Sequence, residues 1–424
     1  MSHFLAQSVE FFTTVLTLAG LGYFLAALLA ARVFLAARRA ALPVFTPGVS
    51  ILKSLKGLDP NMIEAFRSHC RQTYAGEYEL LFGYSSPDDP AIEAVEQLKR
   101  EFPSHSIQLV ECPLSLGANG KVSTLVQLVP HARFDYLLIN DSDIAVSPRY
   151  LERVMAHFAP RTDATGPGPE TGLVTALYRG RAHSTLPSRL EALGIATDFQ
   201  AGVLLSRMIE GGLHYGLGST LAISRAALEK TGGLEPLADH LADDYELGAR
   251  VSQAGYRIAL SAEVVETAIP AYRWQGFIDH QLRWARTVRD ARPWGYVGLI
   301  FTHGLAWAML NMLASGFSPL SLWLFALNFF LRLSVAMAVG AQVLADHQVL
   351  PNLWLLPFRD SVALGFWVFG FAGNTIVWRG QRFELKNGKL KNAASEYRSS
   401  SERKRIHCGD SQSPYDTQPL VVLS

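Results

Sequence analysis

The stretch "INDSDIAV", residues 139–146, places two carboxylates two positions apart directly after the apolar run 136–139. A strand sends alternate side chains to opposite faces, so Asp141 and Asp143 are expected to project from the same side where that strand ends. Paired carboxylates suit Mg²⁺ or Mn²⁺, which bind oxygen and are often shared with substrate phosphates. Taken alone, a short acid pair is more often a solvated turn, so the rest of the chain decides between a metal site and a turn.

Residues 45 to about 290 alternate short β-rich runs with helical stretches. Two of these helical stretches begin with an aspartate before a proline, at Asp59 and at Asp89, which is a typical helix start. Strands that alternate with helices of this length predict an α/β domain with a mainly parallel sheet. The β-rich runs are 48–55, 78–86, 106–113, 135–140, 172–178 and 219–224.

Three acidic clusters lie close to the ends of these elements. They are Asp88 with Asp89, Asp141 with Asp143, and Asp243 with Asp244. Because ligands of such sheets bind beyond the carboxyl ends of the strands, we expect the three clusters to meet at one edge. Each also has a plain structural interpretation, with Asp89 as a helix cap and Asp243 and Asp244 as a match to a helix dipole. Capping and ligand binding are compatible.

The composition suggests a soluble part joined to a membrane part. Hydrophobic residues make up 49% of the 424 residues, and 38 Lys plus Arg nearly balance 37 Asp plus Glu. The net charge of +1 gives no reason to expect a nucleic-acid partner. The three cysteines, Cys70, Cys112 and Cys408, lack a metal-binding spacing, so we expect a reducing compartment and no disulfide framework.

Apolar segments near both ends predict membrane helices. Residues 11–31 carry no charge, and we assign 8–34 as an N-terminal transmembrane helix. Basic residues follow this segment, which disfavours a signal peptide and predicts a cytoplasmic domain after it. Residues 293–378 offer about three further helices, the last over 361–378. Three crossings would place the tail outside, whereas the basic residues after Trp378 favour the inside, so the parity stays open.

An amphipathic basic helix is predicted at the end of the soluble domain, in "QGFIDHQLRWARTVRDARPWGY", residues 275–296. It sets apolar side chains such as Trp284 against four arginines. One interpretation is an interfacial helix that binds anionic headgroups. The other has Trp284 facing an acceptor and the arginines facing phosphate, and both can hold. The polar, Ser-rich tail 392–424 is expected to be disordered.

Taken in order, these stretches resemble the ceramide glucosyltransferase family, and most of all its bacterial relatives associated with hopanoid biosynthesis. The matching stretches are "PGVSILKSLKGLDPNM", "DDPAI", "GANGKVSTL", "NDSDI", "GGLEPLADHLADDYELG" and "HQLRWART". They cover residues 47 to about 290. The resemblance implies a GT-A (Rossmann-like) glycosyltransferase domain with flanking transmembrane helices, three separated acids and an (Arg/Gln)-x-x-Arg-Trp motif.

The resemblance also implies a role for each motif residue. Asp244, with Asp243 beside it, resembles the catalytic general base, and Asp141 with Asp143 resembles the metal pair at the diphosphate. His280 departs from the family pattern, because it occupies the position where Arg or Gln is usual. The residues expected to bind the UDP-sugar are Asp88, Asp89, Asn119, Lys121, Asp141, His280, Arg283 and Trp284.

These roles predict an inverting membrane glycosyltransferase that moves a single hexose from a UDP-sugar, UDP-glucose first, to the hydroxyl of a membrane lipid such as ceramide. A carboxylate can accept the proton of the acceptor hydroxyl, and a divalent metal, Mg²⁺ or Mn²⁺, can stabilise the departing diphosphate. The alternatives are transfer of N-acetylglucosamine or another hexose to a hopanoid or diacylglycerol, a processive polysaccharide synthase, and a non-catalytic membrane protein that keeps the fold.

We further expect a multi-pass membrane protein whose catalytic domain is cytoplasmic, in a bacterial inner membrane rather than in the Golgi. The sequence leaves the oligomeric state undetermined, and it does not separate the candidate sugars and lipids, because pocket shape decides such choices.

Overall fold

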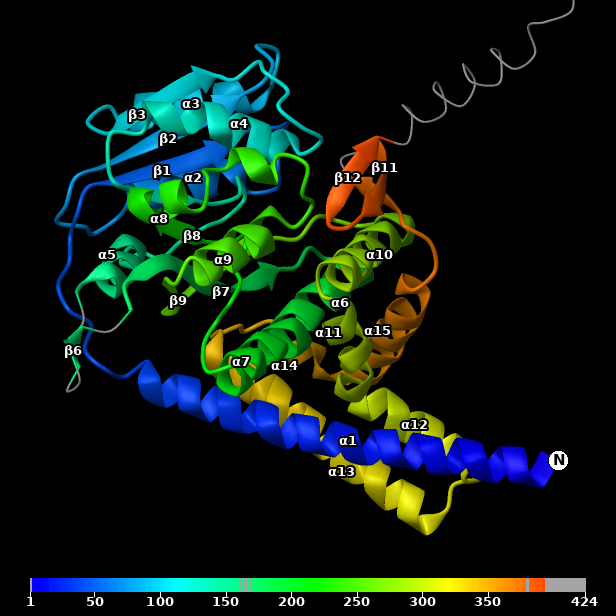
Figure 1. Cartoon of the computed structure of the whole chain (residues 1–424). Helices are drawn as coiled ribbons and strands as arrows, with labels where there is room; N and C mark the ends of the chain where they lie inside the picture. Colours follow the sequence, from blue (N-terminus) through cyan, green and yellow to red (C-terminus); the bar gives the residue numbers. More distant parts are fainter. Residues whose placement is uncertain (1, 161, 164–165, 168, 379–380, 393–424) are drawn as a thin grey trace, which may run out of the picture.

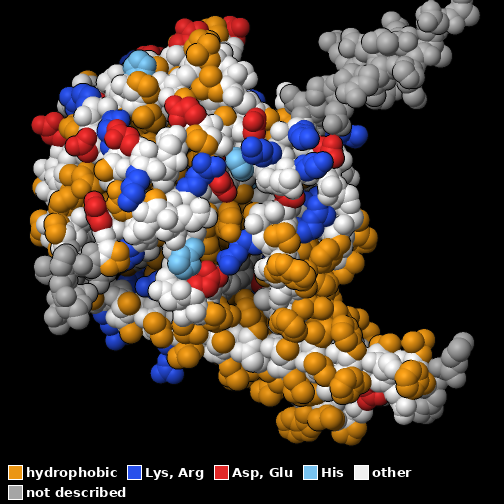
Figure 2. All heavy atoms as spheres, in the orientation of Figure 1, with side chains coloured by type: hydrophobic (Ala, Val, Ile, Leu, Met, Phe, Trp, Pro, Cys, Tyr) orange, Lys and Arg blue, Asp and Glu red, His pale blue; other side chains and the backbone are white. Residues whose placement is uncertain are grey.

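The computed structural model describes residues 2–160, 162–163, 166–167, 169–378 and 381–392. Figure 1 shows an α/β domain above a group of helices, with α1 (Ser2–Ala37) running beneath the domain alongside α12 (Gly304–Ala314) and α13 (Pro319–Val335). Figure 2 shows hydrophobic side chains gathered over these lower helices, whereas Lys, Arg, Asp and Glu cover the α/β domain. The division into a polar and an apolar part agrees with the composition.

A seven-stranded sheet forms the middle of the α/β domain, in the order β3-β2-β1-β4-β8-β7-β9. The first four strands in this order are parallel, whereas β8 is antiparallel to both of its neighbours. Leu221, which begins β8, therefore pairs with Ile139, which ends β4. The strands are β1 (Val49–Ser54), β2 (Tyr78–Tyr84), β3 (Ser106–Glu111), β4 (Tyr136–Ile139), β7 (Thr171–Arg181), β8 (Leu221–Ser224) and β9 (Arg257–Ala268).

Helices cover both faces of this sheet, which explains why its strands are apolar on both sides. Ile51 packs into one core with α2, α3 and α5, and the next residue, Leu52, packs into the opposite core with α4 and α7. The α/β fold class expected from the sequence is confirmed. The helices of the domain are α2 (Met62–Cys70), α3 (Ala91–Glu101), α4 (Gly120–Leu128), α5 (Tyr150–Met155), α6 (Leu186–Gly194), α7 (Gln200–Ile209), α8 (Arg225–Lys230), α9 (Asp243–Gln253) and α10 (Trp274–Ala291).

Two helices of the described chain are long and apolar enough to cross a membrane, Phe4–Ala37 and Pro319–Val343. Pro293–Thr302 and Gly304–Ala314 satisfy the same test together, with a bend of 58° between them, so three spans is the upper count for the described residues. The expected helix over 361–378 is interrupted: α15 (Leu356–Gly370) ends early and β10 (Thr375–Trp378) follows. Gly373, at φ 72°, has the left-handed backbone that commonly follows the end of a helix.

Helices α1 and α12 pack with their backbones in close approach. A Cβ added to Gly20 would lie 2.2 Å from the Cα of Gly304, so the two glycines permit this distance. The hydroxyls of Thr13 and Thr14 donate hydrogen bonds of 3.1 and 2.9 Å to Oδ1 of Asn311. Small residues and buried polar contacts of this kind are typical of helix pairs in membranes.

A small antiparallel sheet follows the apolar helices and returns to the α/β domain. It consists of β10, β11 (Gln381–Lys386) and β12 (Lys389–Asn392). The backbone N–H of Leu241 donates to the carbonyl of Gly388 at 3.1 Å, and that of Leu390 donates to the carbonyl of Asp239 at 2.7 Å. Because these strands touch the α/β domain, the chain between α10 and β10 can cross a membrane only an even number of times.

Gly248 sets how closely α9 approaches the segment before β8. A Cβ there would lie 2.2 Å from the amide nitrogen of Gly216, a contact that only backbone movement can relieve. We expect Gly248→Ala to lower the free energy of unfolding by about 1–3 kcal/mol, as overpacking does. Thermal unfolding of the purified protein measures this effect. Gly212→Ala is the control, because nothing lies within 4 Å of its added Cβ, and equal melting temperatures for the two variants would contradict the prediction.

Candidate active site

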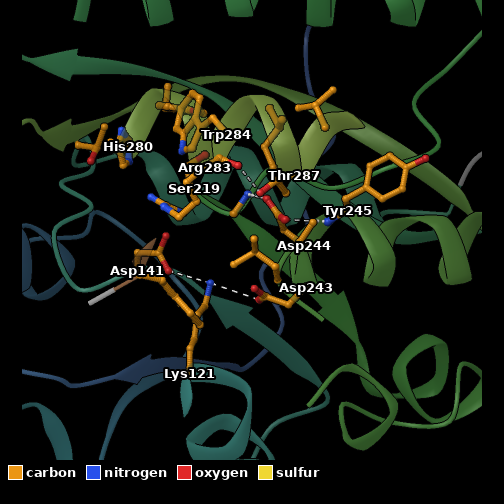
Figure 3. Close-up of a pocket in the computed structure, with 18 of the residues that line it drawn as sticks. Lys121, Asp141, Ser219, Asp243, Asp244, Tyr245, His280, Arg283, Trp284 and Thr287 are labelled. Atoms are coloured by element: carbon orange, nitrogen blue, oxygen red, sulfur yellow. Dashed lines mark hydrogen bonds and ion pairs between the residues drawn. The ribbon is translucent and has the colours of Figure 1, made fainter. Parts of the chain in front are cut away.

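A cavity of about 1100 Å³ lies at the carboxyl edge of the sheet. Its walls come from the segments after β1 and β4, from α4, α9 and α10, from the C-terminal sheet, and from the apolar helices α1 and α15. Figure 3 shows the side chains of Lys121, Asp141, Asp243 and Asp244 facing those of α10 across this space. The cavity therefore joins the acidic edge of the α/β domain to the apolar helices.

Lys121 bridges two of the acidic clusters. Its Nζ lies 2.8 Å from Oδ1 of Asp141 and 3.4 Å from Oδ2 of Asp243 (Figure 3). Burial lowers the pKa of Lys121, but the charges of these two carboxylates outweigh burial and raise it overall. The lysine thus remains a cation at the centre of the site, where a phosphate would also need one.

Asn119 holds Lys121 and Asp243 in place from behind. Its Oδ1 accepts a hydrogen bond of 3.2 Å from the N–H of Val122, which caps α4. Its Nδ2 donates to the carbonyl of His240 at 2.8 Å and to Oδ1 of Asp243 at 3.4 Å. Asn119 is fully buried and does not line the cavity. The sequence predicted that it binds the sugar nucleotide, whereas the structure gives it a positioning role.

The pair Asp141 and Asp143 lies just beyond β4, as the strand alternation predicts. The hydroxyl of Thr267 donates to Oδ2 of Asp143. Burial, followed by the charge of Asp141, raises the pKa of Asp143 to about 6. No group of three or more His, Cys, Asp or Glu side chains in the described part of the chain could hold a metal. Two carboxylates that line a cavity of about 1100 Å³ are still suitable ligands for Mg²⁺ or Mn²⁺. Such ions often bind only one or two protein carboxylates together with substrate phosphates.

A second lysine, Lys53 of β1, lies beneath this pair. Only 1% of it is exposed, and its Nζ donates a hydrogen bond of 3.0 Å to the carbonyl of Asp141. Burial lowers the pKa of Lys53 to about 7, although the charges of Asp143 and Asp141 act in the opposite direction. The sequence analysis missed this residue. The available signal was that this lysine is the one charged residue in the β-rich run 48–55.

Asp244 is the second residue of α9, and its carboxylate is held by two backbone donors. Oδ2 accepts a hydrogen bond of 2.7 Å from the N–H of Gly218, and Oδ1 accepts one of 2.8 Å from that of Tyr245. Burial, followed by the charge of Asp243, raises the pKa of Asp244 to about 6, and Lys121 opposes this rise. A carboxylate with a raised pKa that faces a cavity is suited to proton transfer.

The α10 motif forms the opposite wall. Nδ1 of His280 lies 2.9 Å from Oε2 of Glu191, a carboxylate of α6 that is 3% exposed. The ring of Trp284 lies 5.3 Å from the ring of His280 and 5.8 Å from that of Phe199. Arg283 lines the same cavity. The unusual histidine thus has a buried acidic partner, Glu191, which the sequence analysis did not identify.

Asp88 and Asp89 do not join the other acids, since neither lines the cavity. Both carboxylate oxygens of Asp89 accept from the N–H of Gly57 at 3.0 Å, and Oδ1 also accepts from the N–H of Ala91 at 2.9 Å. Asp88 is exposed. The expectation that three clusters meet is therefore wrong for this one, because Asp89 accepts from the loop after β1 and from the first residue of α3. Asp59, treated as a cap only, does line the cavity.

The C-terminal sheet contributes Trp378, Gln381 and Phe383 to the cavity. Phe383 is 4% exposed and packs in a small core with Leu241, which lies shortly before Asp243. Phe383→Ala should loosen this sheet at a cost of about 3–5 kcal/mol and lower the rate of sugar transfer. Val377→Ala, at a neighbouring strand position that is 37% exposed, is the control for initial-rate assays. Unchanged rates for Phe383→Ala would show that the sheet does not position the acids.

Residues 12–391 match the family described as Glycosyl transferase family 21. The chain is 25% identical over 368 residues to Ceramide glucosyltransferase 3 of Caenorhabditis elegans, covering 81% of this chain and 73% of that relative. It is 24% identical over 360 residues to Ceramide glucosyltransferase 1 of the same species, covering 81% and 72%. Among solved structures, the mannosyltransferase PcManGT from Pyrobaculum calidifontis, in complex with GDP-Man and Mn²⁺, matches with a TM-score of 0.49 and 19% identity, covering 86% of this chain and 97% of that chain.

The acidic cavity at the edge of an α/β sheet, together with the family match, defines a glycosyltransferase that uses a sugar-nucleotide donor. The chain belongs to glycosyl transferase family 21. The resemblance to ceramide glucosyltransferases drawn from the sequence motifs is thereby confirmed.

Proposed function

We propose that this enzyme transfers a single hexose, glucose in the first instance, from a UDP-sugar to the hydroxyl of a membrane lipid such as ceramide, with inversion. The observation that carries the proposal is the extent of the cavity. Its walls include Asp141 and Asp244 at one end and Tyr23 of α1 and Arg359 of α15 at the other. A lipid held among the apolar helices can therefore present a hydroxyl to Asp244.

In this proposal Asp244 accepts the proton of the lipid hydroxyl as that oxygen attacks the sugar. The N–H groups of Gly218 and Tyr245 fix its carboxylate, so it needs little reorientation. Its pKa is closer to pH 7 than that of an ordinary carboxylate, which makes Asp244 a stronger base. Asp243, tied to Asn119 and Lys121, sustains that raised pKa.

The departing UDP would lie at the opposite side of the site. Asp141 and Asp143 would hold a Mg²⁺ or Mn²⁺ ion, which when bound supplies charge stabilisation for the diphosphate. Lys121 adds a fixed positive charge beside Asp141, and Arg283 lines the cavity with its own. We assign the nucleoside to the loops after β1 and β2, where Lys56 and Ser85 line the cavity. Asp89 would act there by bracing the loop at Gly57.

The lipid acceptor implies a membrane position. We propose that residues 8–34 and two spans within 293–343 cross the bilayer, with residues 45–290 and the C-terminal sheet in the cytoplasm. The basic residues that flank α1 on the domain side support this cytoplasmic placement, and we assign the protein to a bacterial inner membrane.

The test uses membranes that contain the full chain. They are incubated with radiolabelled UDP-glucose or UDP-N-acetylglucosamine, together with ceramide, diacylglycerol or a polyhydroxylated hopanoid, with and without Mn²⁺. A lipid carrying one labelled sugar supports the proposal and identifies donor and acceptor. Label in a long polymer would favour a processive synthase, and no turnover of either donor would overturn the assignment.

A further inference from the structure

The end of the cavity at the apolar helices carries polar side chains that the transfer chemistry does not use. Tyr23 of α1, Asp198, His303 and Arg359 all line this end. Apolar side chains would suffice if the acceptor entered only through hydrocarbon. Polar groups at this position indicate that a polar part of the acceptor reaches them.

The charges in this region cancel. Nη1 of Arg359 lies 2.9 Å from Oδ2 of Asp198. Behind this pair, Arg332 donates to both carboxylate oxygens of Asp360 at 2.7 and 3.0 Å, and to Oγ1 of Thr197 at 3.0 Å. Two arginines face two aspartates, so a bound group gains nothing from a charge of its own. The expected ligand is uncharged.

His303 supplies an independent sign of a ligand. Its side chain lines the cavity and only 9% of the residue is exposed. Within the described residues, its buried Nε2 has no hydrogen-bond partner. Leaving a buried polar atom unpaired costs about 1–3 kcal/mol, and such atoms are uncommon in folded proteins. Nε2 itself is buried, so a hydroxyl or amide of a bound acceptor would satisfy it once the ring turns toward the cavity.

The backbone that carries Asp198 is itself unusual. Residues Ile195–Phe199 form a π-helical segment between α6 and α7. Such segments are rare and occur frequently at functional sites. Asp198 and Phe199 both line the cavity, and the ring of Phe199 lies 5.8 Å from that of Trp284. The π-helical segment therefore connects the polar end of the cavity, through Asp198, to Trp284 of α10, through Phe199.

We propose that Asp198, His303 and Arg359 form an acceptor subsite that binds a second, uncharged hydrogen-bonding group of the lipid, a hydroxyl or an amide near the hydroxyl that receives the sugar. The inference rests on the proposed function, because it assigns the acceptor end of the same cavity. It makes these residues determinants of acceptor specificity, since a site built to hydrogen-bond a group discriminates against analogues that lack it.

The experiment compares two acceptors of equal chain length, hexadecan-1-ol and hexadecane-1,2-diol. It uses the purified full chain in detergent and the UDP-sugar that the labelling experiment under the proposed function identifies as donor. The wild-type enzyme should have a kcat/KM for the diol at least about tenfold higher than for the alcohol. His303→Phe replaces the imidazole with an aromatic ring that has no nitrogens, so it should reduce this ratio to about 2, the value expected from two equivalent hydroxyls.

Gly194→Ala tests the subsite without changing any of its side chains. A Cβ there would lie 2.3 Å from Nη2 of Arg359, and the flexible guanidinium can move away without movement of the backbone. The ratio should again fall, mainly through a higher KM for the diol. Gly365→Ala, on the helix α15 that carries Arg359 but with nothing within 4 Å of its added Cβ, should keep the wild-type ratio.

Equal use of both acceptors by the wild-type enzyme would overturn the subsite while leaving the proposed function intact. The same conclusion follows if His303→Phe and Gly194→Ala lower the rates on both acceptors by the same factor. A wild-type chain that turns over no UDP-sugar with any lipid, including ceramide, would overturn the proposed function itself.

Discussion

Asp244→Asn is expected to lower kcat by about 10²–10⁴-fold, the range that general base catalysis contributes. The substitution keeps the size of the side chain but removes its ability to take a proton. It also turns an amide NH₂ toward one of the two backbone donors, Gly218 or Tyr245, that the carboxylate now accepts from. The effect should appear in kcat, whereas the KM for the donor should change little.

The control is Asp279→Asn, a partly exposed aspartate on α10 whose Oδ1 accepts a hydrogen bond of 2.9 Å from Gln275. It should keep wild-type rates, and melting temperatures should show that both variants fold. If Asp244→Asn retains more than about a tenth of the wild-type kcat while Asp243→Asn does not, the base is Asp243 and our assignment is wrong.

The pH dependence follows from the raised pKa of Asp244, which is about 6. The base must be ionised, so kcat/KM should fall about tenfold for each pH unit below that value. The effect on stability has the opposite sign. Because the unfolded pKa is about 3.9, the folded state binds the proton more tightly, and this carboxyl makes stability fall as pH rises from about 4 to about 6.

Lys121→Met is expected to lower kcat/KM for the donor by about 10²–10³-fold, as removal of one fixed electrostatic group does in other enzymes. The substitution preserves most of the side-chain volume but leaves Asp141 and Asp243 without their shared cation. Since Lys121 lowers the pKa of Asp244, its loss should also move the acid limb of the pH–rate profile to higher pH.

Lys99→Met provides the comparison, because Lys99 lies on α3 away from the cavity and pairs with Glu96 of the same helix at 2.9 Å. It should change neither rate nor pH profile. A Lys121→Met enzyme with a lower rate but an unshifted profile would mean that Lys121 acts on the donor alone and not on the acids.

The regular part of the fold could be predicted from the sequence because its signals are local. All six β-rich runs contain strands, from β1 within 48–55 to β8 within 219–224. β9 was missed, since Glu263 and Glu266 interrupt its apolar pattern. Asp141, Asp143 and Asp244 reach the cavity because a strand end or a helix start fixes their direction.

The remaining part of the site depends on contacts between distant segments, which no local pattern encodes. Asp89 lies at the expected sheet edge, but the N–H of Gly57 in another loop takes its carboxylate away from the cavity. The pairing of His280 with Glu191 joins two helices 89 positions apart. The apolar residues of β10 resemble the end of a membrane helix until the turn at Gly373 separates them from α15.

The C-terminal sheet has a consequence for the order in which the enzyme is made. Asp243 and Asp244 leave the ribosome long before β10, β11 and β12, which hold the loop ahead of them through Leu241. Domains generally begin to fold during synthesis, N-terminal parts first. On the proposed topology, the nascent chain must insert α12 and α13 before these strands are synthesised. In an unfinished or wrongly inserted chain, the strands therefore cannot hold the loop before Asp243 and Asp244. Onset of activity would then report successful insertion.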